Sequence, residues 1–128
     1  MNSAKFDTVE FRLLITGGRK FTDAAVIEKA LMDIDVRPDV VIHGDSTGAD
    51  RVAGDIAEKW GIDVWKFPAQ WARFGKAAGP RRNHQMIVEG RPTHVLAFPG
   101  DAGTENMIKQ ASKAGLLVRR ISADGEIN

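Results

Sequence analysis

The sequence predicts an α/β protein with a Rossmann-like three-layer sandwich, in which a five-stranded parallel sheet of order 3-2-1-4-5 carries helices on both faces. Short apolar runs alternate along the chain with segments of helical periodicity. Strands that alternate with helices pair in parallel through right-handed crossovers. A chain of 128 residues suits one domain with one core. In such folds ligands bind where the strand order reverses, here between the first and fourth strands.

The first half of the sequence predicts three strands and two helices in alternation. The strand at 11–16, "FRLLIT", is a short apolar run that two glycines close. The helix at 23–34 has apolar residues near one face, and Thr22 is its candidate N-cap. A second apolar run at 39–43 predicts another buried strand. A helical pattern follows at 48–60, with Ser46 or Thr47 as its candidate N-cap. The alternating pattern at 62–67 is typical of a strand near the sheet edge.

The second half continues the alternation after one irregular segment. Residues 69–79 fit no single pattern, and we expect a loop with a helical turn there. Pro80 is typical of a first helical turn, so a helix is expected at 80–90. A strand, a helix that Gly115 ends and a last strand follow at 93–98, 103–115 and 116–121.

These elements predict one domain at 11–121, with an N-terminal extension at 1–10 and a C-terminal tail at 122–128 that we expect to fray. The net charge of +1 gives no overall attraction to nucleic acid or to an anionic membrane. The chain has no cysteine, and its three histidines lack ligand spacing, so no dedicated metal site is expected. No apolar run approaches the roughly 20 residues that span a bilayer. We therefore predict a cytoplasmic protein without a membrane partner.

Glycine-rich turns follow three of the predicted strands: "TGGRKF" the first, "HGDSTGAD" the second and "PGDAGTEN" the fourth. Parallel strands end at the same edge of a sheet, so these turns gather there. Glycine lets a ligand approach the backbone closely, and each turn leads into a helix N-terminus, which favours an anion. Plain turns are the alternative, because glycine is common at such positions for steric reasons. No turn has the P-loop or the G-x-G-x-x-G pattern.

Charged residues near the turns point to an anionic ligand. Arg81 and Arg82 lie in a first helical turn, where arginine opposes the helix dipole, so an anion clamp explains them better than a structural role. A solvated arginine is the alternative for each. The predicted ligand-binding residues are Gly17, Gly18, Arg19, Gly44, Asp45, Ser46, Gly48, Asp50, Arg81, Arg82, Asn83, Pro99, Gly100, Asp101, Gly103 and Thr104.

Four stretches occur in one order across residues 11 to 121: "LLITGGRKFTD", "VIHGDSTGADRVAGDIAEKWGIDVWKFPAQW", "GKAAGPRRNHQM" and "HVLAFPGDAGTENM". Together they resemble the YspA-type, YpsA-related branch of the SLOG superfamily. The resemblance implies a Rossmann-like domain that binds nucleotides or their derivatives and forms a homo-oligomer, in the first place a homodimer. The superfamily includes the LOG phosphoribohydrolases, the DprA single-strand DNA binders and the molybdenum-cofactor carriers.

The LOG-type loop has the form P-G-G-x-G-T-x-x-E. Four of its positions match this chain, at Pro99, Gly100, Gly103 and Thr104. Asp101 replaces the second glycine, and the terminal Glu, which is the acid of LOG enzymes, falls on Met107. Glu105 is no obvious substitute, because it points about 200° around the helix from position 107. In the second glycine turn, Asp45 and Ser46 stand where the branch commonly has Gly and Ala.

The first hypothesis is therefore a nucleotide-binding protein of the sensor or carrier type. A phosphorylated ligand can bind together with Mg²⁺, and no other cofactor is implied. The alternative is a phosphoribohydrolase-like enzyme that cleaves an N-glycosidic bond and needs a carboxylate near the anomeric carbon. Its candidate catalytic residues are Asp45, Asp101, Glu105 and Arg82. A third hypothesis, a single-strand nucleic-acid binder, is disfavoured by the near-zero net charge and the lack of an aromatic-basic stripe.

Overall fold

The computed structural model describes residues 10–128, so most of the expected N-terminal extension lies outside the described residues. Five parallel strands form one sheet: β1 (Arg12–Thr16), β2 (Val40–His43), β3 (Asp63–Lys66), β4 (His94–Ala97) and β5 (Leu117–Arg120). The helices are α2 (Ala24–Met32), α3 (Ala49–Lys59), α4 (Trp71–Phe74), the 3₁₀ helix η1 (Gly75–Ala77), α5 (Ala78–Gly90) and α6 (Ala102–Lys113).

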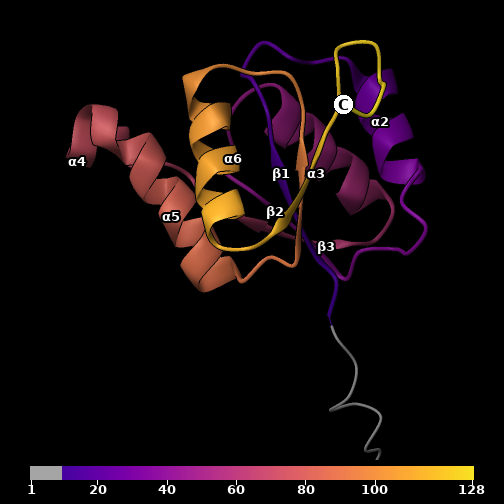
Figure 1. Ribbon diagram of the computed structural model, residues 1–128, viewed down its shortest axis with the longest axis horizontal. Coiled ribbons are helices and arrows are strands. Elements are labelled where there is room, and N and C mark those ends of the chain that lie inside the picture. Colours follow the sequence, from indigo (N-terminus) through magenta and orange to yellow (C-terminus); the bar gives the residue numbers. More distant parts are fainter. Residues whose placement is uncertain (1–9) are drawn as a thin grey trace, which may run out of the picture.

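The strand order is β3-β2-β1-β4-β5, and every neighbouring pair is parallel. In register, Leu14 of β1 lies between Ile42 of β2 and Val95 of β4. Figure 1 shows the sheet between two helical layers, α2 and α3 on one side and α5 and α6 on the other. The predicted Rossmann-like fold and its 3-2-1-4-5 order are therefore confirmed.

The central strand β1 supplies side chains to both layers, because successive residues of a strand point to opposite faces. Leu13 and Ile15 pack in the core under α2 and α3. Leu14 packs in the second core, together with Met107 of α6. Each is at most 2% exposed, and burying a side chain of this size stabilises the fold by about 1.5–3 kcal/mol. An apolar run without alternation is what a strand covered on both faces requires.

Two predicted N-caps are wrong. Helix α2 is capped by Asp23 rather than Thr22, since the Asp23 side chain accepts a hydrogen bond from the Val26 N–H at 3.2 Å. Helix α3 has Gly48 at its N-cap, and neither Ser46 nor Thr47 caps it. The turn before α3 is organised differently, by a carboxylate from within the helix itself.

The irregular segment at 69–79 contains a helical turn, as predicted, formed by α4 and continued by η1. Helix α5 then begins at Ala78, which places Pro80 in its first turn. None of the helices within residues 10–128 has the length and apolar character needed to cross a membrane.

The expectation of a frayed C-terminal tail is wrong. Ile121 and Ile127 form an antiparallel bridge, and the Ser122 N–H donates to the Glu126 carbonyl at 2.8 Å. The Asn128 N–H donates to the Arg120 carbonyl at 2.9 Å. Figure 1 shows this segment turning back beside α2. The cause is a local turn at 122–126, which lets the last residues pair with backbone groups at the end of β5.

Candidate functional site

A cleft of about 990 Å³ opens where the carboxyl ends of β1 and β4 lie side by side. This is the point at which the strand order reverses and where open α/β sheets bind ligands. Twelve predicted site residues line it: Gly17, Gly18, Arg19, Ser46, Asp50, Arg82, Asn83, Pro99, Gly100, Asp101, Gly103 and Thr104. A neighbouring hollow of about 300 Å³ is lined by Gly44 and Asp45, and it shares Arg19, Ser46 and Arg82 with the cleft. Both volumes suit a small ligand.

The turns after β1 and β4 are joined by a backbone hydrogen bond, in which the Gly18 N–H donates to the Pro99 carbonyl at 2.8 Å. The approach is so close that a side chain at Gly100 would collide with the Thr104 hydroxyl and come within 2.8 Å of the Gly18 nitrogen. Glycine at position 100 thus has a structural reason. Contact with a ligand is not needed to explain it.

Helix α6 begins at the cleft with no side chain bonded to its first N–H groups. Its N-cap residue, Asp101, is exposed, and a side chain added at Gly103 would meet nothing within 4 Å. An uncapped helix N-terminus presents N–H donors and a partial positive charge to whatever lies in front of it. This part of the cleft can therefore hold an anion.

The second glycine turn docks on the first. Gly48 has a φ of 87°, and a side chain there would strike the backbone carbonyls of Gly18 and Arg19. The Ala49 N–H also donates to the Gly18 carbonyl, at 3.3 Å. Gly48 lines neither hollow, so its role in the structure is to let two turns pack together.

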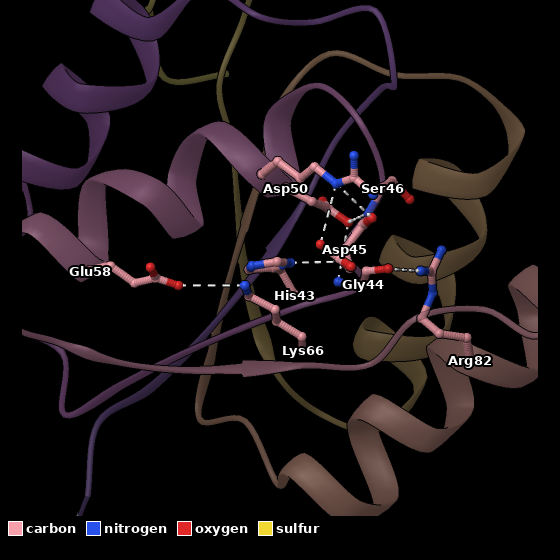
Figure 2. A network of polar contacts seen from close by, with 9 residues as sticks. His43, Gly44, Asp45, Ser46, Asp50, Glu58, Lys66 and Arg82 are labelled. Carbon is pink, nitrogen blue, oxygen red and sulfur yellow. Dashed lines mark hydrogen bonds and ion pairs between the residues drawn. The ribbon is translucent and has the colours of Figure 1, made fainter.

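Asp50, in the first turn of α3, holds the second glycine turn (Figure 2). Its Oδ2 accepts hydrogen bonds from the Gly44 N–H at 3.1 Å and the Ser46 N–H at 3.3 Å. Its Oδ1 has no partner among the described residues. Asp50 is only 4% exposed, and this burial raises the pKa of its carboxyl group to about 6, although Arg82 and the two N–H groups oppose the shift.

His43 is a buried, neutral side chain behind the same turn. Its Nδ1 accepts a hydrogen bond from the Asp45 N–H at 2.9 Å, so the ring proton is on Nε2. Burial lowers the pKa of His43 to about 4. The ring packs against Gly54, where a side chain would collide with Nε2. His43 lines neither hollow, which favours a packing role over general-base chemistry.

Arg82 links the second glycine turn to α6. Its guanidinium donates to the Gly44 carbonyl at 2.5 Å and to Asn83 Oδ1 at 3.0 Å. The Asn83 amide in turn donates to the Gly103 carbonyl at 3.3 Å and to Asn106 Oδ1 at 3.0 Å. Burial lowers the pKa of Arg82 below its ordinary value, and Asp50 opposes that shift. The hydrogen bonds to the Gly44 carbonyl and to Asn83 hold the Arg82 guanidinium at the cleft.

Arg81, although adjacent in sequence, does not line the cleft. It is exposed, and its guanidinium lies 4.4 Å from the centre of the Phe74 ring. Arg19 lies at the cleft with its guanidinium 5.1 Å from the centre of the Trp71 ring. Two consecutive arginines on a helix point about 100° apart, and only one of them faces the sheet edge.

The candidate acids occupy different places. Asp101 lines the cleft at its exposed rim. Asp45 lies in the neighbouring hollow, with a φ of 57°, and pairs with Arg51 at 3.3 Å. Glu105 pairs with Arg120 at 2.8 Å and lines neither hollow. Within residues 10–128 no group of three or more acidic or histidine side chains is arranged to hold a metal ion.

Sequence reasoning missed several residues of the cleft wall. These are Lys76 in the segment before α5, Lys20 after the first glycine turn and Asn106 one turn into α6. Trp71 also lines the cleft, and the sequence suggests it as a residue that stacks on a base or forms a dimer contact. Trp71 is 47% exposed. Lys20 could have been predicted, because a lysine close behind a glycine turn indicates a cation at the sheet edge. Lys76 could not be placed from the sequence, because its segment fits no periodic pattern.

A comparison with models of protein families matches residues 11–74 to the family described as YspA, cpYpsA-related SLOG. The chain belongs to this SLOG family. The matched segment contains the first two glycine turns and the buried Asp50, and it confirms the resemblance seen in the sequence. Membership in a SLOG family is consistent with nucleotide-related binding or processing. No curated protein matches the chain.

Two glycines at the site are expected to respond differently to alanine. Gly48→Ala should lower the free energy of unfolding by about 2–4 kcal/mol, because a positive φ and two carbonyls oppose the new methyl group. Gly103→Ala should keep or raise stability, by up to about 1 kcal/mol, because the methyl group meets open space on a helix. Urea unfolding of both variants measures this contrast, and equal stabilities would contradict the turn packing described above.

Asp50→Asn is expected to alter the pH dependence of stability. The pKa of Asp50 is about 6 in the folded protein against a reference value of 3.8, so the folded state holds the proton more tightly and loses stability as pH rises through this range. The free energy of unfolding of the variant, minus that of the wild type, should increase by about 3 kcal/mol between pH 3.5 and pH 7. His43, with its lowered pKa, acts in the opposite direction and masks the effect in the wild type. Chemical denaturation at several pH values tests this, and a constant difference would contradict it.

Proposed function

We propose that this SLOG protein binds a nucleotide or nucleotide derivative, with the phosphate in front of the α6 N-terminus. The observation that carries the proposal is the uncapped start of α6 inside a cleft at the reversal of the strand order. Four cations line the same cleft: Arg19, Lys20, Lys76 and Arg82. Helix N–H donors and guanidinium groups are common partners of phosphate. If the ligand binds together with Mg²⁺, the phosphate oxygens of the ligand coordinate the metal ion.

Binding without hydrolysis is the preferred form of this proposal. In LOG-type loops the acid occupies the position of Met107, and here that side chain is fully buried against the sheet. Of the acids considered for catalysis, Glu105 is paired with Arg120 outside the cleft, and Asp45 is paired with Arg51. Asp101 remains at the rim. The homodimer and the cytoplasmic location stay predictions from the sequence.

The first test is a thermal unfolding screen against nucleoside mono-, di- and triphosphates, cyclic nucleotides and ADP-ribose-type compounds, with and without Mg²⁺. A ligand present at about 100 times its Kd adds about 2.7 kcal/mol of stability, which raises the Tm of a domain of this size by about 8 °C. We expect at least one phosphorylated compound to reach this shift. A screen in which no compound shifts the Tm would contradict the proposal.

Two neighbouring arginines provide the matched variants. Arg82→Gln should weaken binding of the compound found by about 10–100-fold, because it removes a cation that lines the cleft. Arg81→Gln, the same change one residue earlier, should alter the affinity less than about twofold, because Arg81 lies over Phe74. Unfolding of the free variants checks that Arg82→Gln keeps the fold. Gly103→Ala gives an independent check: its methyl group would enter open space at the start of α6 without contacting protein atoms, and it should weaken binding if the phosphate lies there.

The hydrolase alternative predicts a different product. Incubating the bound nucleotide with the protein and separating the products by chromatography should show no free base. Release of base that Asp101→Asn abolishes, while affinity is kept, would replace the binding proposal by an N-glycosidic hydrolase.

A further inference from the structure

Two buried side-chain atoms among the described residues have no hydrogen-bond partner, His43 Nε2 and Asp50 Oδ1, and of these two residues only Asp50 lines the cleft. Asp50 lines the cleft and is 4% exposed. The N–H groups of Gly44 and Ser46 both donate to its Oδ2, and no described residue bonds to its Oδ1 (Figure 2). The Arg82 guanidinium donates to the Gly44 carbonyl and to Asn83 instead. The carboxyl group therefore keeps one free acceptor inside the protein.

Holding the glycine turn does not explain this second oxygen. A single oxygen accepts both N–H groups, and asparagine would supply one without burying an ionisable group. The raised pKa of Asp50 means that its ionisation costs folding free energy near neutral pH. Buried polar atoms without a partner are uncommon in proteins. Because Asp50 lines the cleft, a ligand atom that enters there is the candidate partner for its buried Oδ1.

The chemistry of the cleft specifies which ligand atom this is. A phosphate group is repelled by a carboxylate and attracted to the cations and to the start of α6. The atom at Oδ1 must instead donate a hydrogen bond. Arg82 connects the two regions, because it bonds to Gly44 beside Asp50 and to Asn83, which bonds to Gly103 in the first turn of α6. The donor nearest to the phosphate in a nucleotide is a sugar hydroxyl.

We propose that Asp50 Oδ1 accepts a hydrogen bond from a sugar hydroxyl of the phosphorylated ligand, which makes Asp50 a specificity-determining residue. The inference rests on the proposed function, from which it takes the position of the phosphate. It assigns the ligand class as nucleotides and ribose phosphates that carry this hydroxyl, in preference to the deoxy analogue that lacks it. A site built to hydrogen-bond a hydroxyl rejects the analogue without it, because the buried acceptor is left unpaired.

The test measures binding of the four ribonucleoside 5′-monophosphates, ribose 5-phosphate and the 2′-deoxy, 3′-deoxy and corresponding fluoro analogues by titration calorimetry. The wild type should prefer a ribo compound over at least one deoxy analogue by about tenfold or more. The fluoro analogue should bind no better than the deoxy one, because fluorine donates no hydrogen bond.

Asp50→Asn is the informative variant, because its amide oxygen can still serve Gly44 and Ser46 while an NH₂ group replaces Oδ1. The preference for the ribo compound should fall below about threefold, and the fluoro analogue should bind better than it does to the wild type. Asp55→Asn is the matched control: the same change on the exposed face of α3 should keep the wild-type preference.

The outcomes separate the two proposals. No binding of any of these compounds to the wild type, together with no Tm shift from any compound of the thermal unfolding screen, overturns both. Binding without a hydroxyl preference, or with a preference that Asp50→Asn leaves unchanged, overturns the role of Asp50 and leaves nucleotide binding intact. An equal loss of affinity for all compounds in Asp50→Asn assigns Asp50 to loop structure alone, and likewise overturns its role in specificity.

Discussion

The contact between the turns that follow β1 and β4 is the constraint on which the rest of the site depends. A single backbone hydrogen bond from Gly18 to Pro99 joins them, and the turn around Gly48 packs against the first. Three turns that are far apart in the sequence thereby meet at one edge of the sheet. The start of α6 and Arg82 line the cleft that these turns border.

The buried polar groups beside these turns each cost folding free energy when they carry a charge. Burial disfavours the charged form of both Asp50 and His43. The carboxyl group is therefore held towards its protonated form and the imidazole towards its deprotonated form, and both of these forms are neutral. A core of apolar side chains would avoid both costs. Functional sites commonly keep polar groups that lower the stability of the fold. Asp50, whose Oδ1 has no partner among the described residues, is such a group.

The fold was predictable because its signals are local: short apolar runs, glycine stops and helical periodicity recur in order. Strands that alternate with helices pair in parallel through right-handed crossovers, and 3-2-1-4-5 is a common strand order of such sheets. Most of the cleft followed, since strand ends share an edge. The sequence could not distinguish Arg81 from Arg82, because the start of α5 sets which one faces the cleft, and the preceding segment is irregular. Nor could it find the Asp23 cap or the paired tail, which depend on local hydrogen bonds rather than on periodicity.

The paired tail also limits how copies of this chain can assemble. Sheets often extend between subunits by adding a strand to a free edge, and β5 is one of the two outer strands. Because the Asn128 N–H already occupies the Arg120 carbonyl at the end of β5, only the first part of that edge stays open to another strand. A continuous intersubunit sheet along the whole of β5 is thus disfavoured.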